Sequence, residues 1–128
     1  MILLAQFAGA FYGLLAIIFG AFGAHALKRT YSDEQLKSFE IGVKYQMYHA
    51  IMLVVLSFNF NLDNPLEKYM VYCFIVGTFL FSFSIYALSW SSSKGKKWKL
   101  LGPVTPIGGL LLVIGWGLLL YAFIRNIV

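Results

Sequence analysis

Two histidines are the side chains of this sequence best suited to proton or metal chemistry, because imidazole titrates near neutral pH. His25 closes a long apolar run, and His49 ends the polar stretch "YQMYH". Together with three other polar side chains in apolar surroundings they make a candidate polar cluster, which comprises His25, Tyr45, Gln46, His49 and Thr105. Two histidines without a neighbouring carboxylate or thiol make a poor metal site. We therefore expect no metal and no cofactor.

Patterns of catalytic residues are absent from the sequence. There is no Ser-His-Asp order, no HExxH motif and no pair of carboxylates inside an apolar run. The five acids all fall in expected loops or helix ends: Asp33, Glu34, Glu40, Asp63 and Glu67. The chain is therefore not expected to be an enzyme.

The composition predicts an integral protein of the cell membrane. Of the 128 residues, 60% are hydrophobic and 12% are charged, and the mean hydropathy is +0.78. Soluble domains are about 45–50% apolar and about 25% charged, and one of this size buries only about two thirds of its unfolded surface. The basic residues form no long stripe, which argues against nucleic acid as a partner.

Four apolar segments are long enough to cross a hydrocarbon core of about 30 Å, which takes about 20 helical residues. They cover about residues 1–27, 43–60, 65–90 and 106–124. The connections leave no room for a second domain, so the sequence predicts a single all-α membrane domain, residues 1–128, built as a bundle of four transmembrane helices. Ser32 with Gln35, and Asn64 with Pro65, are typical of helix starts.

The segment 32–44 favours a short amphipathic helix on the membrane surface between the first two spans. Its apolar residues share one helical face: Leu36, Phe39 and Val43. Gly42 is then the expected bend. An equally good interpretation is one continuous helix over residues 33–60 that protrudes from the bilayer.

Basic residues are distributed unequally between the two ends expected for this bundle. The first and third connections and their flanks share one end, with eight cations: Lys28, Arg29, Lys37, Lys44, Lys94, Lys96, Lys97 and Lys99. The other end has Lys68 and Arg125. Because cytoplasmic loops are enriched in Lys and Arg, we expect these two connections in the cytoplasm and both termini outside.

Small residues recur along the first and fourth spans at the spacing used for close helix packing in membranes. They are Gly9, Gly13, Gly20, Gly23, Gly108 and Gly109. The sequence leaves open whether they pack helices within one chain or between chains, in a homo-oligomer or with other membrane proteins.

The third connection, "SSSKGKKWK", is suited to contact with anionic lipids. Its basic and aromatic residues are Lys94, Lys96, Lys97, Trp98 and Lys99. A Lys near an anionic membrane surface contributes about 1 kcal/mol. The alternative is that these lysines only set the orientation of the chain.

The predicted topology places three polar motifs at one membrane depth. The first span ends at the expected cytoplasmic face with His25, and the second and fourth spans begin there, before His49 and Thr105. Ionisable residues inside a membrane are candidates for function, so a junction of three helices is expected. Polar side chains that only pair between helices are one alternative, and haem held between the two histidines is another.

Three motifs in combination resemble the YwdK-like family of small membrane proteins. They are "GAFGAHALK" at residues 20–28, "YQMYHA" at 45–50, and "GPVTPIGG" at 102–109 with "GW" at 115–116. The resemblance covers essentially the whole chain and implies an integral membrane protein of four helices. It supplies no established reaction, substrate or catalytic residue, so it strengthens the architecture and leaves the activity open.

Two functions follow as hypotheses. The first is a compact, non-enzymatic membrane protein that acts through contacts with its own copies, with other membrane proteins or with anionic lipids. The alternative is an oligomeric channel or transporter for a small solute or ion that uses the candidate polar cluster. That alternative requires an oligomer, because four helices alone are too thin for an aqueous pore.

Overall fold

Four long helices run up and down in the structure, a computed structural model that describes residues 1–127. The elements are α1 (Ile2–His25), η1 (Leu27–Arg29), α2 (Asp33–Asn59), α3 (Pro65–Thr78), η2 (Phe79–Phe83), α4 (Ser84–Ser93), η3 (Lys99–Leu101) and α5 (Val104–Ile127). Four helical stretches are long and apolar enough to cross a membrane: Ile2–His25, Asp33–Asn59, Pro65–Ser93 and Lys99–Ile127. The predicted all-α bundle of four membrane helices is thereby confirmed.

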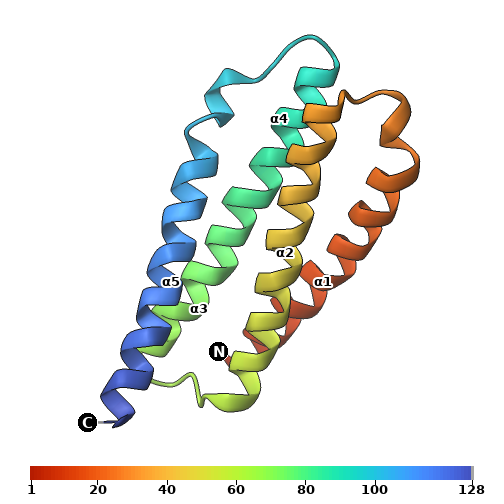
Figure 1. The fold of residues 1–128 in the computed structure, drawn as a ribbon. Helices are drawn as coiled ribbons and strands as arrows, with labels where there is room; N and C mark the ends of the chain where they lie inside the picture. The colour runs from red at the N-terminus through yellow and green to blue at the C-terminus, as the bar shows by residue number, and fades with distance from the viewer. Residues whose placement is uncertain (128) are drawn as a thin grey trace.

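The bundle consists of two helix pairs joined through α2. α1 packs along α2, and α5 packs along α3 and the π-helical turn η2, while α2 also contacts α3, η2 and α4. Figure 1 shows α1 and α5 on opposite sides of the molecule, with both termini at one end. The connections 26–32 and 94–103 meet at the other end, which we call the basic end because it carries eight of the ten Lys and Arg.

α2 is one continuous helix, and the separate surface helix expected over residues 32–44 is not present. The helix begins at the Ser32 capping box, in which Ser32 Oγ accepts from the Gln35 N–H at 3.2 Å and Gln35 Oε1 accepts from the Ser32 N–H at 2.9 Å. Gly42 does not bend the chain, because it packs inside the bundle, where an added Cβ would lie 2.7 Å from the Tyr86 ring. At 27 residues, α2 is about 40 Å long and exceeds the hydrocarbon core.

The other predicted helix start is also confirmed, at Asn64, whose side chain accepts from the Glu67 N–H at 3.0 Å ahead of Pro65 at the first helical position. α5 begins at Val104, two residues earlier than the expected boundary at residue 106. Thr105 is therefore inside the first turn, where its hydroxyl lies 2.6 Å from Ser84 Oγ on α4. This contact joins the start of α5 to the start of α4.

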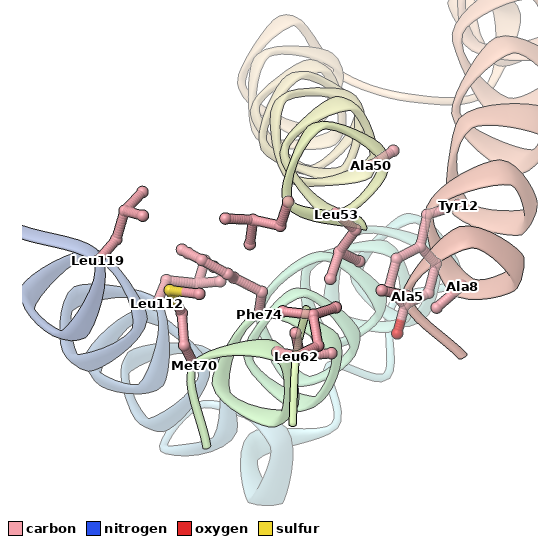
Figure 2. Packing of buried hydrophobic residues seen from close by; sticks show 12 residues of the cluster. Ala5, Ala8, Tyr12, Ala50, Leu53, Leu62, Met70, Phe74, Leu112 and Leu119 are labelled. Carbon is pink, nitrogen blue, oxygen red and sulfur yellow. The ribbon is translucent and has the colours of Figure 1, made fainter. Parts of the chain in front are cut away.

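The apolar core occupies the bundle from its middle to the end away from the basic end. Figure 2 shows side chains of α1, α2, α3 and α5 converging there. The cluster is Ala5, Ala8, Tyr12, Ala50, Leu53, Leu56, Leu62, Met70, Val71, Phe74, Leu112 and Leu119. Toward the basic end the buried side chains include four hydroxyls, from Ser82, Ser84, Ser89 and Ser91, together with Ala16, Tyr31 and Phe39. The two halves of the bundle thus differ in what they bury.

The closest approach between helices lies where α5 crosses η2. A Cβ added at Gly108 would lie 2.8 Å from the backbone carbon of Leu80, and it would also meet the Phe81 backbone. Only a glycine fits against another backbone at this distance. This contact holds α5 against the π-helical turn.

We expect Gly108→Ala to lower the free energy of unfolding by about 1–3 kcal/mol, because the backbone of η2 cannot move aside as a flexible side chain can. Gly117→Ala, on the same helix, is the matched control, since nothing lies within 4 Å of its added Cβ. The control should unfold at the same temperature as the parent or slightly higher. Thermal unfolding in detergent compares the two, and equal losses would contradict the described packing.

Candidate functional site

Gln46 and His49 are buried at the middle of the bundle. α1 and α2 run antiparallel, with Gly13 opposite Ala50 and Gly20 opposite Val43. The midpoint of α1 is therefore level with His49. His49 is therefore farther from the basic end than the junction at one depth that the sequence predicted, since α2 is one continuous helix that begins at Asp33.

Gln46 links three helices through both ends of its amide. The side chain is 0% exposed, its Nε2 donates to the Tyr12 carbonyl at 2.8 Å, and its Oε1 accepts from the Tyr86 hydroxyl at 2.7 Å. The Tyr12 hydroxyl in turn donates to the Ile75 carbonyl at 2.8 Å. The network joins α1, α2, α3 and α4, and it pairs polar atoms that would be costly to leave alone in hydrocarbon.

His49 is 4% exposed and faces α5. Its Nδ1 lies 2.6 Å from the Tyr45 carbonyl, and its Nε2 lies 3.1 Å from Trp116 Nε1. A carbonyl can only accept a hydrogen bond and an indole N–H can only donate one. The pair therefore fixes a neutral imidazole with its proton on Nδ1. Both ring nitrogens are used, so neither is free to bind a metal.

His25 does not join this cluster. It is exposed at the end of α1, and the antiparallel register places it twelve residues beyond Gly13, the residue level with His49. At 1.5 Å per residue the two histidines are about 18 Å apart along the helix axis. The predicted junction at one depth is thus not formed, and the two rings cannot ligate one haem iron. Within residues 1–127, no three His, Cys, Asp or Glu side chains are grouped to hold a metal ion.

The remaining members of the candidate polar cluster have separate surroundings. Thr105 pairs with Ser84 toward the basic end. The exposed Tyr45 ring packs against Phe81 at 5.0 Å between centroids. Gln46 and His49 face different neighbours and are not bonded to each other. The sequence did not predict the partners of Gln46 and His49, which are Tyr12, Tyr86 and Trp116. The sequence indicates these partners only in that each is an aromatic residue with a polar group, placed within an apolar span.

The glycines singled out from the sequence differ in how closely they pack within the chain. Added Cβ atoms would lie 2.8 Å from the Ala50 carbonyl oxygen at Gly9 and 2.8 Å from Phe39 at Gly23. Looser contacts, between 3.4 and 3.8 Å, surround Gly13, Gly20 and Gly109. The tight positions, with Gly108, are occupied by helices of the same chain.

The basic end contains a polar recess of about 460 Å³ between α2, α4 and the start of α5. Hydroxyl and amide groups line much of it, from Ser32, Gln35, Ser38, Ser89, Ser92 and Thr105. Gln35 Nε2 donates to Ser92 Oγ at 3.1 Å and so joins α2 to α4 beside the recess. Glu34 and Lys97 also reach it.

The lysine-rich connection lies exposed above this recess. Lys94, Lys96, Lys97 and Lys99 are all exposed, and the Trp98 ring meets Trp90 at 5.5 Å. The Trp98 N–H donates to Ser91 Oγ at 3.2 Å, which ties the connection to α4. In the connection 26–32, burial raises the pKa of Tyr31, and a hydrogen bond with Ser93 offsets part of this shift.

We expect Trp116→Phe to lower the free energy of unfolding by about 1 kcal/mol, because it keeps an aromatic ring and removes only the donor to His49. In a His49→Phe background the same change should cost almost nothing, since its partner is already absent. Unfolding of the parent, the two single variants and the double variant measures this coupling. Additive losses would contradict a bond between the two side chains.

Comparisons with known proteins agree with this architecture. A family model described as a protein of unknown function (DUF423) matches residues 19–109. A UPF0382 membrane protein of Haemophilus influenzae is 32% identical over 114 residues, 89% of this chain and 88% of the relative. The UPF0382 membrane protein YwdK of Bacillus subtilis is 34% identical over 119 residues, 91% of this chain and 93% of the relative.

The similarity extends beyond bacteria. A UPF0382 membrane protein of Schizosaccharomyces pombe is 33% identical over 109 residues, 84% of this chain and 91% of the relative. No solved structure matches. The matches confirm the resemblance to YwdK-like proteins, and they name membrane proteins without an activity. The chain belongs to the DUF423 family, an integral membrane protein family of unknown function.

Proposed function

We propose that this protein is a non-enzymatic membrane protein that binds anionic lipids at its basic end. The observation that carries the proposal is the distribution of charge. The basic end holds eight of the ten Lys and Arg but only three of the five acids, Asp33, Glu34 and Glu40. The side chains at this end therefore account for the whole net charge of +5, and those at the other end balance.

The positive charge is placed where lipid head groups would meet it. The rings of Trp90 and Trp98 are each about half exposed at this end. Tryptophan is enriched at the level of the head groups on both faces of a membrane. Lys94, Lys96, Lys97 and Lys99 flank Trp98 in the sequence and are all exposed, so an anionic head group would find several cations on this connection.

The charge distribution also supports an orientation. Because Lys and Arg are enriched in cytoplasmic loops, the basic end faces the cytoplasm and both termini face outside. The inner leaflet is also the anionic one in many cells, with a surface potential near −30 mV. The orientation and the proposed lipid contact are thus mutually consistent.

A channel or transporter is the alternative, and no observation favours it. The polar side chains in the middle of the spans bind neighbouring helices: Tyr12, Gln46, His49, Tyr86 and Trp116. Groups that pair with each other in this way stabilise the bundle rather than offer a path to a solute.

We expect the triple variant Lys94→Gln, Lys96→Gln, Lys99→Gln to bind anionic lipid at least about tenfold more weakly, because each Lys near an anionic surface contributes about 1 kcal/mol. Binding of a fluorescent phosphatidylglycerol to the detergent-solubilised protein measures the affinity by anisotropy. Binding of the parent should weaken as salt is raised.

The double variant Lys68→Gln, Arg125→Gln at the opposite end is the control, and it should bind like the parent. Equal binding by the triple variant and the parent would reject the proposal. Native mass spectrometry of the same preparations counts chains per particle, which tests the homo-oligomer considered from the sequence.

Orientation can be tested by labelling single cysteines in a Cys73→Ala background. Lys96→Cys in the third connection should react with a membrane-impermeant maleimide only after the cells are opened. Asp63→Cys in the connection 60–64 should react in intact cells, because that connection faces outside. The reverse pattern would show that the chain is inserted the other way.

A further inference from the structure

The recess at the basic end contains a hydroxyl that forms no hydrogen bond within the described part of the protein and is open to the recess. Ser89 is 5% exposed and lines the recess. The neighbouring serines Ser84, Ser91 and Ser92 all have hydrogen bonds, to Thr105, Leu88 and Gln35 respectively. Within residues 1–127, Ser89 has none. Because its oxygen is not one of the buried atoms without a partner, the Ser89 hydroxyl is free to bond a molecule that enters the recess.

The recess exists because α4 and α5 lie side by side over only a short stretch near the basic end. α5 packs closely along α3 and η2, but it makes few contacts with α4. α5 begins at Val104, level with the start of α4, where Thr105 meets Ser84 at 2.6 Å, so most of α4 has no helix α5 beside it and the long connection 94–103 spans the gap (Figure 1). The resulting volume, about 460 Å³, is within the range of about 300–1,000 Å³ that is usual for small-molecule sites.

The lining indicates the chemistry of the occupant. Hydroxyl and amide groups both donate and accept hydrogen bonds, which suits a ligand that carries hydroxyls of its own. Glu34 and Lys97 both reach the recess, where Lys97 offers a cation to an anionic group and Glu34 offers an acceptor to a hydroxyl, and Ile85 and Leu88 provide an apolar wall on α4. A phosphate attached to a small polyol, with a hydrocarbon part beside it, satisfies all three features.

We propose that the recess is a binding site for a phosphoglycerol-type head group, with the phosphate near Lys97 and the glycerol hydroxyls against Ser89 and the other hydroxyl groups. The inference rests on the proposed function and deepens it, because the exposed lysines attract anionic lipids in general and the recess selects among them. The same chemistry is present in soluble glycerol 3-phosphate, so the test must separate lipid from solute.

Two lipids of equal charge test the selection. Phosphatidylglycerol has free hydroxyls on its head group, whereas phosphatidylmethanol has the same charge and none. Native mass spectrometry of the full chain in detergent measures the affinity for each. We expect the parent to prefer phosphatidylglycerol by about fivefold, the effect of one or two additional hydrogen bonds. Equal binding of the two lipids would overturn the inference.

Ser89→Ala should abolish this preference while leaving phosphatidylmethanol binding unchanged. Its unfolding temperature without lipid should also be unchanged, because the hydroxyl makes no bond within the protein. Ser57→Ala is the matched control. Ser57 is likewise 5% exposed, but it donates to the Val54 carbonyl on the half of α2 away from the basic end. A preference retained in Ser89→Ala would overturn the inference.

The two proposals can fail separately. The triple lysine variant keeps Lys97, so it should lose affinity for both lipids and keep the fivefold preference. If the parent does not bind anionic lipid more tightly than neutral lipid, the proposed function fails. Binding of glycerol 3-phosphate that depends on Ser89 would then identify the recess as a site for a soluble ligand. Absence of both kinds of binding would reject the recess as well.

Discussion

The structure depends on one constraint, which is that hydrocarbon offers no hydrogen bonds to a polar group. A polar atom buried within the spans is therefore normally paired inside the protein, and among residues 1–127 the buried side-chain atoms without a partner are Glu67 Oε2 and Thr78 Oγ1. Gln46 meets this requirement at both ends of its amide, and the bonds that satisfy it also fix the neighbours of α2. Tyr12 extends the network to the Ile75 carbonyl, just before the π-helical turn. Pairing of polar groups, more than apolar attraction, specifies which helices lie side by side.

The same constraint explains why serine is the main buried polar residue of α4. A serine hydroxyl can return to a carbonyl of its own helix, as Ser84 does to Phe81 and Ser91 does to Leu88. Such a group can be buried in a membrane helix without a partner on another helix. Ser89 differs because no such bond is formed and the recess lies beside it. Its hydroxyl can therefore remain available for a ligand without weakening the bundle.

Periodicity and end signals were sufficient to predict the four helices, and the capping residues Ser32 and Asn64 were identified from local rules. Those rules depend on residues a few positions apart, which the sequence displays directly. The partners of Gln46 and His49 could not be derived, because a helical face shows which residues are buried but not which helix covers them. The distance between His25 and His49 was misjudged for a related reason, since the depth of His49 depended on whether α2 bends at Gly42.

The location of the recess follows from the division of the bundle into two halves. Apolar packing in the half away from the basic end fixes α5 against α3, and the backbone contact at Gly108 fixes it against η2. Beyond that contact only the first turn of α5 remains, where Thr105 bonds Ser84, and the connection 94–103 covers the remaining distance to the end of α4. Lys97 is the lysine of the connection that lines the recess, and like Lys94, Lys96 and Lys99 it is exposed to solvent. The packed half thus fixes the position of α5, and the connection 94–103 then spans the recess in the opposite half.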